Sequence, residues 1–253
     1  MPLAKQATEG RRTLAAEAAV ALVYNGTTHV VLMATPADLT DLAIGFSHTE
    51  GIAGPAQTQG LEIVTHPHGH EVRMWLVPEA AHRLAGRRRA MVGPTGCGLC
   101  GVESLEEAAR TPPRVAATLT LAPAQIHDAL AALPAHQPLG QATRAAHAAA
   151  LWTPEGGIVL AREDVGRHNA LDKLAGAALA RGIDSARALL LLTSRVSVEM
   201  VQKAAHMGVG ILAAVSAPTR LAVETAEAAN VTLIAVARDD GFELFTHPWR
   251  IAL

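Results

Sequence analysis

The chain contains 253 residues, of which 50% are apolar and 3% aromatic, and its formal net charge is −2. A charge this close to zero gives no general attraction to nucleic acid or to an anionic membrane. No apolar run reaches the roughly 18 residues that a membrane span needs, and no signal-peptide segment follows the basic residues near the N-terminus. We therefore expect a cytoplasmic protein with no nucleic-acid partner and no membrane partner.

The first part of the chain has the signals of a small α+β unit, which follows a disordered tail over residues 1–12. Asn25-Gly26 separates two β-rich runs, and this dipeptide is the strongest short signal for a hairpin. Apolar residues at helical spacing then predict a helix. The elements expected are strands at 17–24, 28–34, 61–65 and 71–77 and a helix at 38–50. We assign this unit to residues 13–95, together with the cysteine loop and its surroundings at 96–135.

The second part, residues 136–253, alternates apolar strands with helices. This rhythm is typical of a parallel α/β sheet with right-handed crossovers. From residue 96 onward, helices are expected at 103–110, 123–133, 139–151, 169–180, 196–207 and 219–229. Strands are expected at 149–153, 157–161, 188–192, 211–215, 232–236 and 242–246.

The two cysteines of the chain, Cys97 and Cys100, lie three residues apart in a glycine-rich loop. In a reducing compartment this spacing indicates catalysis or metal binding rather than a structural disulfide. Positive charge lowers the pKa of a thiol, and three consecutive arginines at 87–89 precede the loop. Three other interpretations remain open: a thioredoxin-like redox pair, an inert buried pair, and part of a zinc site completed by His66, His68 and His70 or by a second copy of the chain.

Polar segments follow three of the expected strands. Ligands of open parallel sheets bind beyond the carboxyl ends of the strands, where helix N-termini offer free N–H groups to anions. Arginines there suit a phosphate-rich ligand such as a nucleotide, and the alternative is ordinary helix capping. The spacing of Glu199 and Lys203 predicts an ion pair along one helix. The candidate ligand residues are Asp164, Gly166, Arg167, His168, Asn169, Thr193, Ser194, Arg195, Ser216 and Thr219.

Several motifs occur together in one order, and the run from Glu163 to Lys173 is the most specific of them. They are Asp38-Leu39 with Ala43-Ile44-Gly45-Phe46 and Thr49-Glu50-Gly51, the cysteine loop, Glu163-Asp164-Val165-Gly166-Arg167-His168-Asn169-Ala170-Leu171-Asp172-Lys173, Thr193-Ser194-Arg195 and Ser216-Ala217-Pro218-Thr219. In these motifs the chain resembles the FdhD family, the formate dehydrogenase accessory sulfur carriers. The resemblance covers nearly the whole chain after the tail.

This resemblance implies a sulfurtransferase that carries sulfur as a cysteine persulfide. A cysteine desulfurase would hand sulfane sulfur to Cys97, with Cys100 assisting. The carrier would pass it to the molybdenum or tungsten of a bis-molybdopterin guanine dinucleotide cofactor, which is then inserted into formate dehydrogenase. By matching, the cofactor-contacting segment near the C-terminus is Val236, Ala237, Arg238, Asp239, Asp240 and Gly241.

The larger part of the chain is expected, from the same resemblance, to have a cytidine-deaminase-like three-layer fold. That fold holds zinc through cysteines at its second helix, where this chain has Ser194-Arg195-Val196-Ser197. The resemblance therefore implies the scaffold without zinc or deaminase chemistry. We also expect a homodimer. Two rival functions stay open: a chaperone that holds the cofactor without moving sulfur, and a zinc-bound regulatory module.

Overall fold

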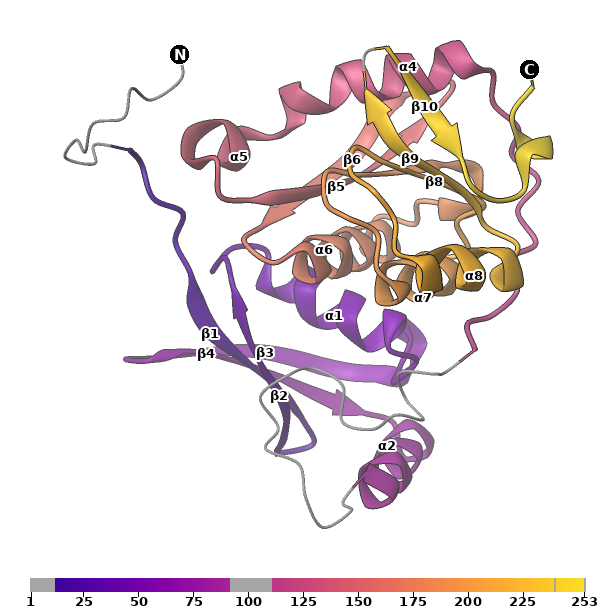
Figure 1. Ribbon diagram of the computed structural model, residues 1–253. Coiled ribbons are helices and arrows are strands. Elements are labelled where there is room, and N and C mark those ends of the chain that lie inside the picture. Colours follow the sequence, from indigo (N-terminus) through magenta and orange to yellow (C-terminus); the bar gives the residue numbers. More distant parts are fainter. Residues whose placement is uncertain (1–11, 92–110, 239, 253) are drawn as a thin grey trace.

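The structure is a computed structural model that describes residues 12–91, 111–238 and 240–252. It contains a four-stranded and a six-stranded sheet, each packed against helices (Figure 1). The predicted tail, the short helix at 103–110, and both cysteines lie outside the described residues, apart from residue 12. Within the described part, no helix is long and apolar enough to cross a membrane.

The N-terminal unit is built on the sheet with strand order β2-β1-β4-β3. The predicted hairpin is confirmed, because Asn25 and Gly26 both have positive φ, as a two-residue hairpin turn requires. Helix α1 packs on the sheet and ends before Gly51, which also has positive φ. The elements are β1 (Ala18–Tyr24), β2 (Thr27–Ala34), α1 (Leu39–Thr49), β3 (Thr58–His66), β4 (Gly69–Leu76) and α2 (Pro78–Met91), with a 3-10 turn at Pro55–Gln57.

The C-terminal unit has three layers around the sheet with strand order β10-β9-β8-β7-β5-β6. The elements are α4 (Pro123–Ala132), α5 (Pro138–Thr143), β5 (His147–Thr153), β6 (Gly157–Asp164), α6 (Arg167–Ala180), β7 (Leu189–Leu192), α7 (Val198–His206), β8 (Ile211–Ala214), α8 (Arg220–Ala229), β9 (Thr232–Arg238) and β10 (Gly241–Leu244). Short 3-10 turns lie at Leu133–His136, Ser185–Arg187 and Pro248–Arg250.

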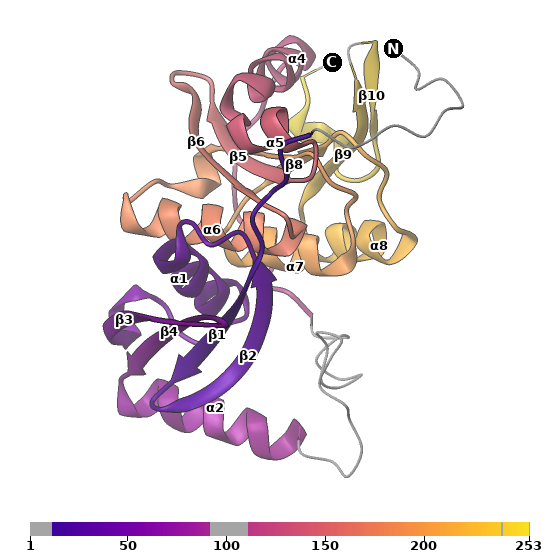
Figure 2. The same cartoon turned by 90° about the vertical axis from the view of Figure 1, so that its left-hand side faces the viewer.

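Alternating side chains of the central strands separate the two faces of this sheet. Leu190 and Leu192 of β7 face a core formed with α6, α7 and α8. Leu189 and Leu191 face a second core, formed with α4. Figures 1 and 2 show the sheet between these two helical layers, with the N-terminal unit beyond α6 and α7. The larger unit is therefore a three-layer α/β arrangement.

Three expectations are corrected. The six-stranded sheet is mixed. Strands β7, β8 and β9 run parallel to one another, whereas β5 pairs antiparallel with β6 and β7, and β10 pairs antiparallel with β9. The helix predicted at 139–151 is wrong beyond Thr143, because β5 begins at His147. Its alanines favour a helix locally, but Ala149 and Ala150 are fully buried between two strands, and tertiary pairing outweighs propensity. Helix α2 was not predicted.

The two units meet where α1 crosses α6. A Cβ atom on Gly45 of α1 would lie 1.7 Å from the carbonyl oxygen of Asp172, and one on Gly176 of α6 would lie 1.9 Å from that of Asp41. Only glycine leaves room for such backbone contact. The crossing fixes α1 against the helix whose N-terminus carries the longest motif of the sequence.

Candidate functional site

The polar segments singled out in the sequence do come together at one edge of the six-stranded sheet. His147 at the start of β5 pairs with Asp164 at the end of β6, and Leu192 at the end of β7 pairs with Ala149 and Ala214. Beyond these ends, the amide of Val236 donates to the carbonyl oxygen of Ser216. The ends of β6, β7, β8 and β9 thus form the edge at which α/β sheets bind ligands.

Asp164 organises the turn that leads from β6 into α6. Its Oδ1 accepts hydrogen bonds from the amide of Gly166 at 2.8 Å and from the side chain of Asn169 at 3.0 Å. Its Oδ2 accepts from the amide of Thr35 and pairs with Lys173. Since Asp164 is fully buried and engaged on both oxygens, it shapes the turn, whereas Arg167 and His168, which follow it in α6, are half-buried.

Arg167 and His168, at the first turn of α6, carry side-chain nitrogens that the fold leaves without a partner. Arg167 Nε and His168 Nε2 are buried, and neither has a hydrogen-bond partner among the described residues. The nearest carboxylate oxygen of Glu199 is 4.0 Å from His168 Nε2, although the imidazole as a whole keeps 39% of its side-chain surface exposed. A buried donor without a partner costs free energy, so these atoms suit an incoming acceptor.

The protonation of the nearby imidazoles follows from their surroundings. Burial lowers the pKa of His168 to about 4, and the positive charges of Arg167 and Lys203 act in the same direction. Burial also lowers the pKa of His147, again with a contribution from Arg167. Both rings are therefore neutral near pH 7, and the positive charge at this position comes from Arg167.

The hydroxyls at the ends of β7 and β8 serve the protein's own backbone. Thr193 accepts a hydrogen bond from the amide of Ala148, and Ser194 donates to the carbonyl oxygen of Arg195. Thr219 caps α8 by accepting from the amide of Ala222. Arg195 and Thr219 are exposed, and Ser216 is half-buried. Helix capping thus accounts for a threonine at position 219 without a ligand. Arg195 is exposed and adds a second positive charge, besides Arg167, to this edge of the sheet.

Two other strand-end arginines have partners elsewhere. Arg162 Nε and Nη2 donate to Asp41 of α1 at 2.9 and 2.7 Å, so this side chain ties the two units together. Arg220 is almost fully exposed and pairs with Glu224 one turn along α8. Of the four arginines near the strand ends, Arg167 and Arg195 are the ones that the edge can offer to an anion.

The segment from Val236 to Gly241 forms the end of β9, a turn and the start of β10. Val236 has a φ of 53°, which is a rare conformation for a β-branched residue, and strained backbone of this kind clusters at functional sites. Ala237 is buried, Arg238 and Asp240 are exposed, and Asp239 lies outside the described residues. The segment borders the edge beside Ser216.

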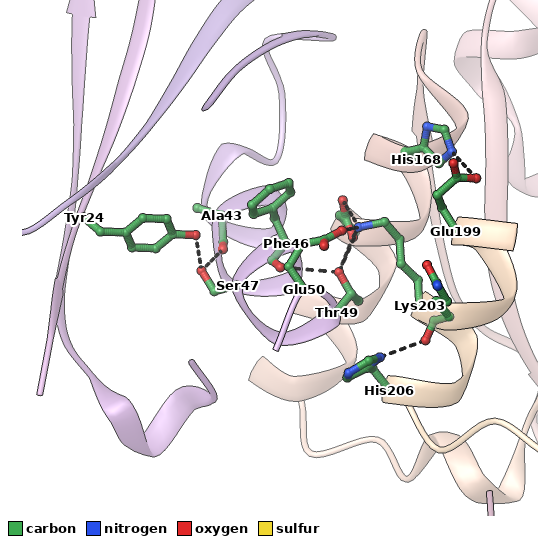
Figure 3. A network of polar contacts seen from close by, with 12 residues as sticks. Tyr24, Ala43, Phe46, Ser47, Thr49, Glu50, His168, Glu199, Lys203 and His206 are labelled. Atoms are coloured by element: carbon green, nitrogen blue, oxygen red, sulfur yellow. Dashed lines mark hydrogen bonds and ion pairs between the residues drawn. The ribbon is translucent and has the colours of Figure 1, made fainter. Parts of the chain in front are cut away.

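A second cluster of charged side chains lies between α1, α6 and α7, one helical turn beyond His168 on α6 and Glu199 on α7 (Figure 3). Lys203 Nζ lies 2.9 Å from Asp172 Oδ1 and 3.1 Å from Thr49 Oγ1, and it also pairs with Glu50. The predicted pair of Glu199 with Lys203 is therefore wrong, because burial directs Lys203 across the interface. The sequence signal was present: Asp172 and Lys203 each interrupt the apolar face of a helix.

No group of three or more histidine, cysteine or acidic side chains is placed to hold a metal ion within the described ranges. His66, His68 and His70 lie around the β3–β4 hairpin and line a pocket of about 480 Å³ with Glu17 and Met33. Cys97 and Cys100 lie outside the described residues, so the structure does not place them relative to these histidines or to the strand-end edge.

Comparison with known proteins gives one consistent family. A model of the FdhD/NarQ family matches residues 15–252. The sulfur carrier protein FdhD of Agrobacterium fabrum is 48% identical over 250 residues, covering 96% of this chain and 91% of that protein. The protein of the same name from Cupriavidus necator is 49% identical over 239 residues, and the match covers 94% of this chain and 83% of that protein.

A solved structure agrees with the sequence relatives. The crystal structure described as that of a formate dehydrogenase accessory protein from Desulfotalea psychrophila matches with a TM-score of 0.72 and 26% identity, covering 95% of this chain and 91% of that one. The fold, and not only the sequence motifs, is therefore shared. The chain belongs to the FdhD/NarQ family.

Proposed function

We propose that this protein is a sulfur carrier that receives sulfane sulfur on Cys97 and delivers it to a bis-molybdopterin guanine dinucleotide before that cofactor enters formate dehydrogenase. The observation that carries the proposal is the match, at 48% identity over most of both chains, to a protein named as a sulfur carrier. The named accessory role of the structural relative supports formate dehydrogenase as the client.

The loading step needs only the Cys97 thiolate and a persulfide donor, for which we propose a cysteine desulfurase. The thiolate attacks the outer sulfur of the donor's persulfide, the donor's S–S bond breaks, and the donor cysteine leaves as a thiolate. A new S–S bond then links Cys97 to the transferred sulfur. No net oxidation or reduction accompanies this exchange, because one persulfide replaces another.

Delivery requires two electrons, which the two cysteines together supply. The Cys100 thiolate attacks Cys97 Sγ, a Cys97–Cys100 disulfide forms, and the outer sulfur leaves as hydrosulfide. Hydrosulfide then replaces an oxygen ligand at the metal of the cofactor substrate, and that oxygen leaves as hydroxide. A cellular dithiol reductant returns the disulfide to two thiols. The three-residue spacing of the cysteines suits this ring closure.

The strand-end edge is the proposed binding region for the guanine nucleotide part of the substrate. Arg167 supplies positive charge beside the N-terminus of α6, and the neutral imidazole of His168 offers an unpartnered Nε2, which donates a hydrogen bond in the tautomer that carries its proton there. Donors and helix termini of this kind hold phosphate oxygens. The support for this assignment is the pair of buried, unpartnered side-chain nitrogens of Arg167 and His168, together with the strained Val236 beside Ser216 at the same edge of the sheet.

The deciding experiment is intact-protein mass spectrometry after incubation with a cysteine desulfurase and cysteine. We expect one added sulfur mass on Cys100→Ser, a smaller yield of the same product on the wild-type protein because Cys100 can displace the sulfur as hydrosulfide, and none on Cys97→Ser. The same variants should be scored for formate dehydrogenase activity in cells that lack the native gene. A Cys97→Ser/Cys100→Ser protein that supports full activity would favour a chaperone that holds the cofactor without moving sulfur, and would overturn the proposal.

A further inference from the structure

The seam between α1, α6 and α7 buries three charged side chains that the proposed sulfur transfer does not use. Asp172 of α6 is 1% exposed and Lys203 of α7 is 4% exposed. Thr49, the last residue of α1, donates a hydrogen bond to Asp172 Oδ1 at 2.6 Å. Glu50, which caps the same helix, pairs with Lys203 and is half-buried. We call Thr49, Glu50, Asp172 and Lys203 the seam cluster.

The seam cluster is unbalanced in charge, because two carboxylates share one ammonium group. The charged groups that face Asp172 are Lys203 from α7 and Glu50 from the end of α1. His168 and Glu199 follow one turn outward on α6 and α7. When Glu50, Asp172 and Lys203 are all ionised, one negative charge remains in this site. Buried excess charge is costly, and a carboxyl group relieves it by taking up a proton.

The pKa shifts of Asp172 and Lys203 agree with this imbalance of charge. Burial raises the pKa of Asp172 from 3.8 to about 6, with Glu50 adding to the rise and Lys203 opposing it. For Lys203, burial by itself lowers the pKa, but the carboxylates of Asp172 and Glu50 raise it above its ordinary value. The ammonium group thus stays charged, and Asp172 is the member that exchanges a proton near neutral pH.

The other end of α1 is attached differently. Lys173 and Asp164 form a charge-balanced, fully buried pair that binds both the amide and the carbonyl group of Thr35, just before α1. Arg162 pairs with Asp41 in the first turn of α1. Between the two ends, Gly45 and Gly176 allow direct backbone contact without interlocking side chains. The helix is therefore anchored at its N-terminal end. At its C-terminal end the seam cluster acts together with the titratable His48, whose Nε2 lies 2.9 Å from the carbonyl oxygen of His206 in α7.

We propose that the seam cluster is a proton-linked latch: Asp172 takes up a proton more readily while the end of α1 is packed against α6 and α7 than when that end separates and water reaches the carboxyl group. Only a proton moves in this step, from the carboxyl group to water, and no bond between heavy atoms changes. The latch would regulate how the N-terminal unit sits on the C-terminal unit. It is independent of whether the protein carries sulfur.

The direction of the pH effect follows from linkage. In the closed arrangement the pKa of Asp172 is about 6, and in the open arrangement it approaches 3.8, the value of a hydrated carboxyl group. Between these values the closed arrangement binds a proton that the open one does not. The free energy that this proton contributes to the closed arrangement is therefore fully present below about pH 4 and is lost as the pH rises through about 6.

The test is hydrogen–deuterium exchange of the full-length protein between pH 5 and pH 8, corrected for the intrinsic pH dependence of exchange. In the wild type, protection of peptides covering residues 39–50 should fall by about tenfold as the pH rises through 6, since one pKa unit corresponds to a factor of ten. Peptides from α4 serve as the internal reference. Asp172→Asn keeps an acceptor for Thr49 without a titrating proton, so its α1 protection should not change with pH.

Two further variants keep the test decisive if Asp172→Asn does not fold. Glu50→Gln removes the excess negative charge and should move the wild-type midpoint to lower pH. Asp128→Asn, an exposed change on α4, should reproduce the wild-type profile. A wild-type protein without a transition in α1 protection would overturn the latch. So would a Glu50→Gln protein with an unshifted midpoint.

Discussion

Lys173 Nζ lies 2.6 Å from Asp164 Oδ2, and neither side chain has any exposed surface. The two residues lie within the most specific motif of the sequence, where exposed ligand-binding groups were expected. They instead clamp the backbone of Thr35, at the end of β2, onto the start of α6. Part of the motif therefore builds the turn that presents Arg167 and His168, and only the outward-facing residues remain for a ligand.

Breaking this buried pair should be strongly destabilising. Lys173→Met leaves the Asp164 carboxylate buried without its partner, and such losses cost about 3–5 kcal/mol of unfolding free energy. Urea denaturation at pH 7 measures the effect. Arg220→Met is the matched control, because it breaks an exposed pair with Glu224 and should cost at most about 1 kcal/mol. Equal losses in the two variants would show that the clamp does not stabilise the fold.

The backbone contact between α1 and α6 predicts a second large effect. Gly176→Ala would place a Cβ atom 1.9 Å from the carbonyl oxygen of Asp41, so the helices must separate. Overpacking of this kind costs about 1–3 kcal/mol or more. Gly86→Ala is the control, because its Cβ atom meets nothing within 4 Å in helix α2. Thermal unfolding should show a lowered midpoint for Gly176→Ala and an unchanged or raised one for Gly86→Ala.

The strand-end edge predicts binding of guanosine diphosphate through Arg167. Arg167→Gln removes a charged donor to a phosphate, which is worth about 1.5–3 kcal/mol and corresponds to a roughly tenfold to hundredfold weaker affinity. Isothermal titration calorimetry measures the change. Arg187→Gln, an exposed change just before β7 and so at the opposite edge of the sheet, should bind as the wild type does. The assignment fails if both variants bind equally well.

His168 should remain neutral over the whole physiological range. Its pKa of about 4 lies below the ordinary 6.5 because the folded protein buries the ring near Arg167. The unfolded chain therefore binds a proton between pH 6.5 and 4 that the folded chain does not, and His168 reduces stability as the pH falls through that window. Histidine-selective NMR titration, with His168→Gln to assign the resonance, should show no protonation above pH 5. A midpoint near 6.5 would contradict the buried, cationic surroundings.

Thr219 offers a way to separate capping from ligand binding. Its hydroxyl caps α8, so Thr219→Ala should cost about 1 kcal/mol of stability while Thr219→Ser should cost little. If capping is its whole role, neither variant changes the affinity for guanosine diphosphate in calorimetry. A weaker affinity in Thr219→Ala with full affinity in Thr219→Ser would add Thr219 to the binding residues.

The sequence predicted correctly those turns and helix ends that depend on the conformational preferences of one or two residues. The Asn25-Gly26 hairpin follows from the conformations those residues favour, and α8 ends at Asn230, which adopts the left-handed conformation expected of a helix terminator. The helix predicted at 139–151 is wrong beyond Thr143, because alanine favours a helix there but β5 begins at His147; the strand predicted at 149–153 is confirmed as part of β5. Strand pairing with β6 and β7 is a non-local interaction, and no window of sequence contains it.

The sequence by itself determined the family, the alternation of strands and helices in the C-terminal unit, and the gathering of polar residues at the ends of its strands. These follow from residue order and from periodic burial, which each segment carries in its own composition. Only the tertiary structure decided which polar residues face outward. Asp172 and Lys203 became buried partners in the α1–α6–α7 seam, and Asp164 and Lys173 became a buried pair that holds Thr35, whereas Arg167 and His168 were left with unpartnered nitrogens at the edge. The reason is that a charged side chain pairs with whatever the fold brings next to it, and those neighbours can lie far apart in the chain: Asp172 contacts Lys203, 31 residues away, and Thr49, 123 residues away.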